Sequence, residues 1–173
     1  MAKVGLISDT HGYIDDKIVA YFEDCDQIWH AGDIGGLAIT DELAKIAEVK
    51  AVYGNIDGQE IRRVWPENQL FTYQGVKILI THIAGYPGRY NGRVKALIQQ
   101  HRPHAVMVGH SHIVKVLRDA SDNHLHINPG AAGIHGFHKV RTIATMHIDN
   151  GRMHDFQLIE LGKRGAIHQP PSA

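Results

Sequence analysis

Short runs of Val, Ile, Leu and Ala recur along this chain of 173 residues, and most of them end directly in a small packet of polar side chains. Apolar runs of this length are typical of buried strands, so each packet is expected where a strand ends and its loop begins. The packets hold seven side chains able to bind a metal: Asp9, His11, Asp33, Asn55, His82, His110 and His112. Because ligands of α/β sheets bind at the carboxyl ends of strands, we expect the seven to converge on one edge.

The first half of the chain alternates strand-like and helix-like segments. Strands are predicted over residues 3–8, 27–31 and 49–53, and amphipathic helices over 14–24 and 37–47. This alternation favours right-handed crossovers and a mainly parallel first sheet.

The second half has a different pattern. Gln74-Gly75 predicts a hairpin between strands at 70–73 and 76–81, and a helix at 91–101 stops before Pro103. A buried strand at 105–108 is followed by alternating segments at 114–118, 124–128, 142–148 and 153–161. These late strands are expected to form a second sheet stacked on the first.

Length and composition narrow the possible classes of protein. The length suits one domain, predicted over residues 1–162, with a flexible tail at 163–173. Lys and Arg number 18, as do Asp and Glu, so no basic surplus favours strong binding to nucleic acid or to a membrane surface. The single Cys25 excludes an internal disulfide and fits a reducing cytoplasm, and no signal peptide or membrane span is predicted.

Seven oxygen and nitrogen donors are more than one ion requires, which is the pattern of a binuclear hydrolytic centre. Two divalent cations about 3.5–4 Å apart neutralise a phosphoryl group and hold a bridging water as hydroxide. Asp33, from the central strand, is the natural carboxylate to bridge them. Taken singly, each packet also fits a helix cap, a turn or a core histidine. Their joint occurrence at strand ends favours the metal site.

The order of the packets, D-x-H, GD, GN, H and GHxH, resembles the calcineurin-like metallophosphoesterases. The resemblance covers the chain from Lys3 to about Leu161. The Leu-Ile-Ser-Asp-Thr-His-Gly opening, the Gly-His-Ser-His ending and the Asn128-Pro129-Gly130 turn look most like the small bacterial and archaeal phosphodiesterase branch, whose fold the small retromer subunit shares.

The resemblance implies an α/β fold, a four-layer αββα sandwich of two mixed sheets flanked by helices, with the metal site at the strand C-terminal ends. It implies one metal on Asp9, His11, Asp33 and His112 and another on Asp33, Asn55, His82 and His110. The two divalent ions would be Mn first of all, or Ni, Zn, Fe or Co. Asn55 and His11 are expected to serve catalysis as well as metal binding.

One position departs from the family pattern. Many members read G-N-H-[DE] at the third packet, whereas this chain has Ile56, which cannot move a proton. Weak hydrolysis of esters with poor alkoxide leaving groups, and better hydrolysis of activated aryl esters, is expected. Asp57, His135 and His138 are alternative acids, although a solvated role is open for each. Arg89 is either a phosphate-binding group or a solvated arginine.

The remaining histidines point to packing. His30 is predicted to be a core imidazole rather than a partner of the ligands, and the four late-strand histidines are read as surface or inter-sheet positions: His124, His126, His147 and His154. The leading functional hypothesis is a cytoplasmic metal-dependent phosphodiesterase with a small phosphodiester substrate, and homo-oligomers are compatible with the sequence. The alternatives are a weakly active interaction module and a phosphomonoesterase.

Overall fold

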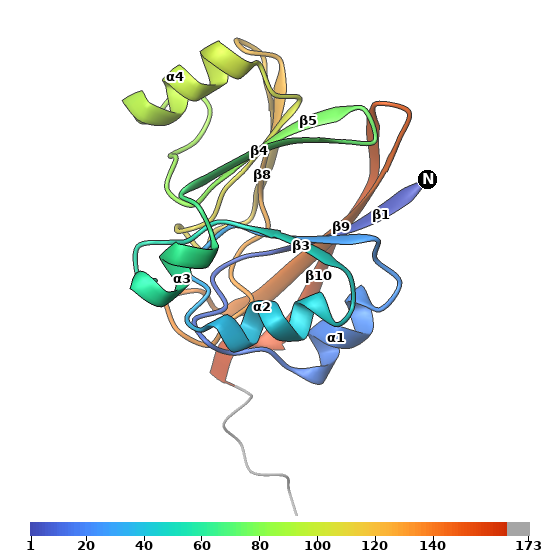
Figure 1. The fold of residues 1–173 in the computed structure, drawn as a ribbon, viewed down its shortest axis with the longest axis vertical. Coiled ribbons are helices and arrows are strands. Elements are labelled where there is room, and N and C mark those ends of the chain that lie inside the picture. The colour runs from blue at the N-terminus through green and yellow to red at the C-terminus, as the bar shows by residue number, and fades with distance from the viewer. Residues whose placement is uncertain (166–173) are drawn as a thin grey trace, which may run out of the picture.

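Two five-stranded β-sheets stack face to face, with helices on both outer surfaces, in a computed structural model that describes residues 1–165 (Figure 1). The first sheet has the order β10-β9-β1-β2-β3, with these bounds: β1 Ala2–Ile7, β2 Gln27–His30, β3 Glu48–Ala51, β9 Val140–Asp149 and β10 Arg152–Lys163. The second has the order β4-β5-β6-β8-β7, with these bounds: β4 Asn68–Tyr73, β5 Val76–Thr81, β6 Ala105–Met107, β7 Lys115–Asp119 and β8 His124–Asn128.

Four helices complete the layers in the described residues: α1 Asp16–Phe22, α2 Leu37–Ala44, α3 Gln59–Val64 and α4 Gly92–His101. In Figure 1, α1 and α2 cover the outer face of the first sheet, and α4 covers that of the second. The predicted four-layer α/β sandwich of two mixed sheets is therefore confirmed.

Three apolar layers hold the sandwich together. Between the sheets, Leu6 and Trp29 of the first sheet pack with Ile78 and Met107 of the second. A second cluster joins α1 and α2 to the first sheet, and a third joins α4 to the second. Side chains alternate along a strand, so β1 supplies Leu6 to one layer and Ile7 to the other.

Strand direction brings the polar packets to one end. β1, β2 and β3 run parallel, as do β5, β6 and β8 in the second sheet. The carboxyl ends of parallel strands meet at a common edge, so the loops that follow β1, β2, β3, β5 and β6 all open at the same end of the sandwich.

The structure corrects the predicted placement of the last strands. β9 pairs antiparallel with β1, and β10 pairs with β9, so both strands belong to the first sheet. Of the four late strands, β7 and β8 alone belong to the second sheet. An alternating pattern shows that a strand is half buried but not which sheet its edge completes. α3 was not predicted, because Ile61 is the one fully buried side chain of this six-residue helix.

The predicted boundary of the tail is also too early. Lys163 still belongs to β10, and Arg164 donates to the carbonyls of His138 and Ile134. The rest of the predicted tail, 166–173, lies outside the described residues. Among the helices of residues 1–165, none has the length and apolar character needed to cross a membrane.

Candidate metal centre

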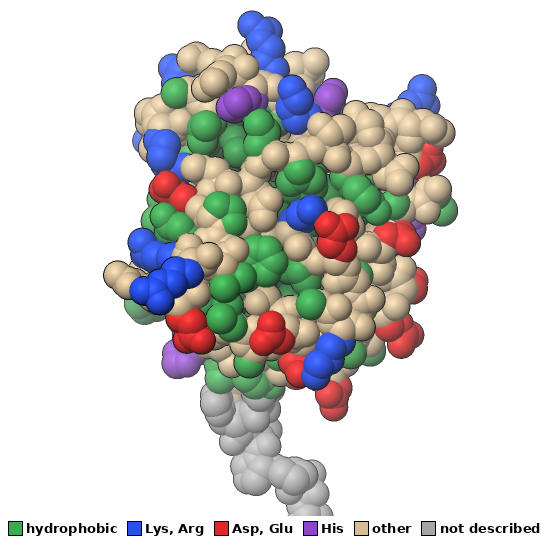
Figure 2. All heavy atoms as spheres, in the orientation of Figure 1, with side chains coloured by type: hydrophobic (Ala, Val, Ile, Leu, Met, Phe, Trp, Pro, Cys, Tyr) green, Lys and Arg blue, Asp and Glu red, His purple; other side chains and the backbone are tan. Residues whose placement is uncertain are grey.

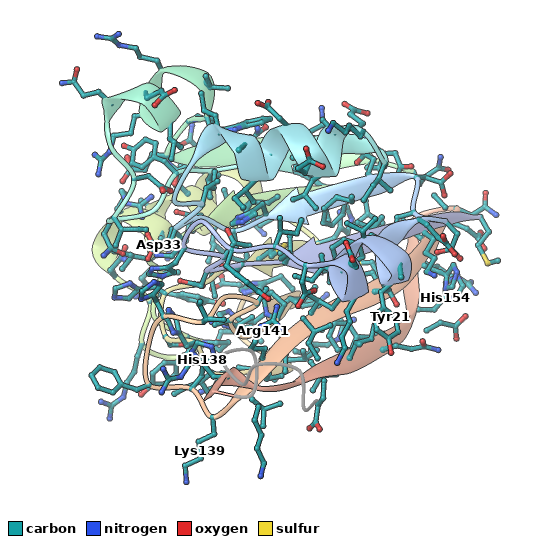
Figure 3. All side chains as sticks on the ribbon, turned by 90° about the horizontal axis from the view of Figure 1, so that it is seen from below. Tyr21, Asp33, His138, Lys139, Arg141 and His154 are labelled. Carbon is teal, nitrogen blue, oxygen red and sulfur yellow. The ribbon has the colours of Figure 1, made fainter. Side chains whose placement is uncertain are left out.

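All seven predicted ligands lie in loops at one end of the sandwich. Asp9 and His11 follow β1, Asp33 follows β2, and Asn55 follows β3. The three remaining histidines come from the second sheet, His82 after β5 and the pair His110 and His112 after β6. Figure 3 shows Asp33 and His138 at this end of the molecule and His154 at the opposite end.

The first group of donors surrounds a buried carboxylate. Asp9 Oδ1 lies 3.2 Å from His112 Nε2 and 3.9 Å from His11 Nε2. The other oxygen, Oδ2, accepts from the Ser8 hydroxyl at 2.6 Å and from the His110 amide at 3.1 Å. Within the described residues, Asp9 Oδ1 and His11 Nε2 are buried and have no hydrogen-bond partner.

The second group lies beside the first. His82 Nε2 is 3.2 Å from Asp33 Oδ1 and 3.1 Å from Asn55 Oδ1, which is itself 3.0 Å from His110 Nδ1. Asp33 Oδ2 faces the other way and lies 3.4 Å from His11 Nε2. The two oxygens of Asp33 therefore face the two groups, as a bridging carboxylate requires.

These distances fit metal ligation. Two ligands on one ion, each about 2.1 Å from it, are separated by about 3–3.5 Å. A buried carboxylate oxygen and a buried imidazole nitrogen without partners are costly unless something else binds them. Asp9, His11 and His112 form one cluster able to hold an ion, and Asp33, His82 and His110 form another. The residues present thus fit divalent metal.

Hydrogen bonds set which ring nitrogen of each histidine faces the centre. His82 Nδ1 donates to the carbonyl of Ala31 at 2.7 Å, which leaves the lone pair of Nε2 for a metal. His138 Nε2 donates to the carbonyl of Gly133 at 2.8 Å, so its Nδ1 accepts from His112 Nδ1 at 3.1 Å. That bond leaves His112 Nε2 unprotonated and directed at Asp9.

His138 is therefore a positioning residue rather than the acid that the sequence left open. Replacing His138 with Leu is expected to weaken Mn²⁺ binding about 10–100-fold, because outer partners of ligating histidines contribute this much. His138→Asn, which keeps an acceptor for His112, is expected to lose less. Isothermal titration with Mn²⁺ measures both, and a Leu variant that binds as tightly as the wild type would contradict the assignment.

Five of the seven donors adopt a left-handed backbone: Asp9, His11, Asp33, His110 and His112 have φ between 47° and 74°. This conformation is unfavourable for residues other than glycine, and such strain concentrates at functional sites. The glycines before the ligands leave room for them: a Cβ on Gly54 would collide with Asp33, and one on Gly109 would collide with Ser8 and Asp9.

Charges within the centre keep the carboxylates ionised. Burial alone would raise the pKa of Asp33, but the adjacent imidazoles of His11 and His82, 3.4 Å and 3.2 Å from its oxygens, outweigh it and hold the pKa far below its usual range. The pKa of Asp9 is also lowered, against its burial, by His112 and His82. The nearby carboxylate of Asp33, 3.4 Å from Nε2, raises the pKa of His11. Metal must therefore displace protons from imidazoles, and its affinity falls in acid.

Asp57 has a different role from the two considered for it from sequence. It is 2% exposed, and its carboxylate accepts from the backbone amides of Ile34, Gly35 and Gly54 at 2.8–3.0 Å. Both oxygens are thus used to join the loop after β2 to the loop after β3. Asp57 is neither a solvated carboxylate nor a replacement acid, and no residue pattern indicates these backbone contacts in advance.

The other candidates lie as follows. His135 is exposed, and its ring centre lies 6.1 Å from that of His11. Arg89 is exposed and makes no side-chain hydrogen bond to any described residue. His124 and His126 are buried against the hydroxyl of Tyr90, while the half-exposed rings of His147 and His154 stack on each other.

His30 is a core imidazole that also contacts the site. Its Nδ1 accepts from the Gly32 amide at 3.1 Å, and its Nε2 donates to the Thr10 hydroxyl at 2.9 Å. Thr10 lies in the sequence between the predicted ligands Asp9 and His11. His30 is therefore both a buried core residue and a hydrogen-bond partner of the loop that carries them, whereas the prediction from sequence treated these roles as alternatives. Burial lowers the pKa of His30 to about 4.

This buried imidazole predicts a pH dependence of stability. Below pH 6.5 His30 becomes protonated in the unfolded chain but stays neutral in the folded chain. The contribution of His30 to the free energy of unfolding is therefore fully present above pH 6.5 and is lost as the pH falls toward 4. His30→Gln cannot titrate. We expect the stability advantage of the wild type over this variant to shrink by about 2 kcal/mol between pH 7.5 and pH 5. Urea unfolding at both values measures it, and an unchanged difference would contradict the buried neutral imidazole.

Comparison with known proteins agrees with this geometry. Residues 2–151 match the model of the calcineurin-like phosphoesterase superfamily domain. A probable metallophosphoesterase of Mycoplasma pneumoniae is 31% identical over 165 residues, which cover 90% of this chain and 95% of the relative. A probable metallophosphoesterase of Methanothermobacter thermautotrophicus is 29% identical over 133 residues, which cover 74% of this chain and 76% of the relative.

Solved structures share the fold at lower identity. An archaeal phosphodiesterase superposes with a TM-score of 0.71 at 23% identity, covering 92% of this chain and 99% of the other. Vps29 of Entamoeba histolytica, complexed with Zn²⁺, superposes with a TM-score of 0.71 at 16% identity, covering 94% and 99%. The family match spans most of the sequence and includes every packet described above. The chain therefore belongs to the calcineurin-like phosphoesterase superfamily, and its relatives above are probable metallophosphoesterases.

Proposed function

We propose that the protein is a phosphodiesterase that works through a binuclear divalent-metal centre. The observation that carries the proposal is the convergence of seven donors around Asp33, with two of them, Asp9 Oδ1 and His11 Nε2, buried and lacking partners in the described structure. Two bound divalent ions supply a hydroxide nucleophile near neutral pH and neutralise the charge of the phosphoryl group.

The assignment of ligands follows the two groups. One ion would be held by Asp9, His11, Asp33 and His112, and the other by Asp33, Asn55, His82 and His110. Mixed oxygen and nitrogen donors suit Mn²⁺, our first choice, and also Ni, Zn, Fe or Co.

Asn55 is the residue of this centre best placed to contact the substrate itself. Its side chain is exposed, and its Oδ1 faces His82 and His110. Its Nδ2 has no acceptor among the described residues, so it is free to donate to a phosphoryl oxygen whose charge grows in the transition state. Across the site, His135 beside His11 is an exposed imidazole outside the two donor groups and a candidate to assist the leaving group.

Ile56 limits the reaction to good leaving groups. Its side chain is 47% exposed, while its amide donates to Asp33 Oδ1 at 3.0 Å. Ile56→His therefore offers an imidazole at the site without removing a core side chain. We expect hydrolysis of a methyl ester leaving group to rise by about 10²-fold, with aryl esters changed little, since proton donation matters most for poor leaving groups. Parallel rate measurements check this, and an equal effect on both esters would contradict it.

The direct test of the proposed function compares two substrates. Chelator-stripped protein is assayed with added Mn²⁺ on bis(4-nitrophenyl) phosphate and on 4-nitrophenyl phosphate. Metal-dependent turnover with preference for the diester supports a phosphodiesterase, and preference for the monoester would make it a phosphomonoesterase. Absence of turnover on both, despite bound metal, would favour the interaction module, for which the shared fold with Vps29 is the supporting observation.

The surroundings that suit this function follow from charge and redox chemistry. In the view of Figure 2, acidic side chains gather over the lower half of the molecule and basic ones are spread over the upper half and the left edge. This face has no continuous basic surface, in keeping with a small phosphodiester as substrate rather than a polynucleotide. We place the protein in the cytoplasm, where the buried Cys25 stays reduced.

A further inference from the structure

We propose that an apolar pocket beside His110 binds the organic group of the substrate, and that this group is a single flat aromatic ring system. The inference rests on the proposed phosphodiesterase function and names its substrate class. The pocket has a volume of about 290 Å³ and lies between the loop that follows β5 and the loop that follows β6, with β8 beneath them.

The pocket is continuous with the candidate metal centre. The side chain of His110 belongs to both, because it lines the pocket and its Nδ1 lies 3.0 Å from Asn55 Oδ1. Gly109, also in the lining, packs against Asp9 and His82. A phosphate held at the centre would therefore place one of its ester groups at the mouth of this pocket.

The walls favour an apolar and aromatic occupant. Ile113 and Tyr86 stand on opposite loops, 63% and 41% exposed, and give the pocket an apolar wall on each side. The ammonium of Lys115 lies 4.1 Å from the centre of the Tyr86 ring, so it fixes that ring and adds a positive charge at the rim. A phosphodiester, which combines an anion with an organic group, matches this arrangement.

The floor offers few polar contacts of its own. Asn128 donates to the Gly109 carbonyl and the Ser111 hydroxyl and accepts from the Gly130 amide. His126 Nδ1 is bonded to the Tyr90 hydroxyl at 2.7 Å. Because Asn128 is already satisfied and His126 uses Nδ1 on Tyr90, a polar occupant such as a sugar alone would lose hydrogen bonds with water and gain few in return.

The size of the pocket favours a small molecule over a protein as its occupant. About 290 Å³ is at the small end of ligand pockets, enough for one ring system and its linkage, whereas a stable protein interface needs about 800 Å² from each partner. A second pocket, of about 200 Å³, is lined by Asn55 and His82 of the centre and includes Arg62. Two pockets flanking the centre suit the two arms of a diester, and the one at His110 is the apolar one.

The test compares esters that share a leaving group. Methyl 4-nitrophenyl phosphate, bis(4-nitrophenyl) phosphate and thymidine 5′-(4-nitrophenyl phosphate) all release 4-nitrophenol and differ in the second group. We expect Ile113→Ser to lower kcat/KM for the two aromatic esters by at least about tenfold relative to the methyl ester. A lower kcat/KM for the bis-aryl ester alone identifies a simple aryl group as the occupant, and a lower kcat/KM for the thymidine ester alone identifies a nucleobase. An unchanged kcat/KM for both esters overturns the proposal.

Two controls separate the possible failures. Leu158→Ser changes a similarly exposed apolar residue on β10, away from the pocket, and is expected to leave all ratios unchanged. Binding of phenylphosphonate and methylphosphonate to the Mn²⁺-loaded protein gives a readout without turnover. Absence of diesterase activity in the wild type would contradict the proposed function. Tighter binding of phenylphosphonate than of methylphosphonate, lost in Ile113→Ser, would still support the pocket. Equal binding of the two phosphonates by wild type would overturn it.

Discussion

Replacing Asp33 with Asn is expected to lower metal-dependent phosphodiester turnover by at least about 10³-fold, because a bridging carboxylate serves both ions and their charge stabilisation is worth several kcal/mol. Asn is the same size, and its amide oxygen can still accept from the Ile56 amide as Asp33 Oδ1 does at 3.0 Å. What it removes is the negative charge between His11 and His82.

Steady-state kinetics and Mn²⁺ titration of this variant measure the two consequences together. Asp16→Asn, at an exposed carboxylate in the first turn of α1, is the matched control and should behave as the wild type. Retention of more than about a tenth of the activity by Asp33→Asn would show that Asp33 does not bridge two ions.

Replacing Asp57 with Ala is expected to lower the free energy of unfolding by at least about 3 kcal/mol, since three backbone amides lose their acceptor and each buried unsatisfied group costs about 1–3 kcal/mol. The same change frees the loops that carry Asp33 and Asn55 from each other, so Mn²⁺ affinity should fall with stability. Asp57→Asn, which keeps one acceptor oxygen, should lie between Ala and the wild type.

Urea unfolding in chelator, with Asp122→Ala as an exposed control, measures the stability effect. The alternative role of Asp57, as a general acid, predicts another result. In that case Asp57→Asn would retain full stability and metal binding and lose only the basic limb of the pH–rate profile, where a proton donor must stay protonated.

The donors could be located from sequence because strand ends are visible in it. Apolar runs mark β1, β2, β3, β5 and β6, and each is followed by its ligands at the predicted edge. Local patterns could not assign β9 and β10 to the first sheet, since that pairing depends on contacts such as Val4 with Met146, far apart in the chain. The helix α3 escaped prediction because one buried side chain gives no periodicity.

The supporting residues were harder to foresee than the ligands. Asp57 was considered as an acid because it follows the third packet, and His138 because it lies in a glycine-bearing loop after Asn128-Pro129-Gly130. Their actual roles depend on backbone groups, the Gly133 carbonyl for one and three amides for the other. The left-handed backbone at Asp9, His11 and Asp33 could not be predicted either, since Asp and His are enriched in this conformation but do not require it.

Counting bound ions while following turnover distinguishes a binuclear centre from a single-ion site. Chelator-stripped protein is titrated with Mn²⁺, and binding stoichiometry and hydrolysis of bis(4-nitrophenyl) phosphate are measured on the same samples. A binuclear centre is expected to bind two ions per chain, with turnover rising as the second ion binds. Turnover that is complete with one ion per chain, or that persists without metal, would contradict it.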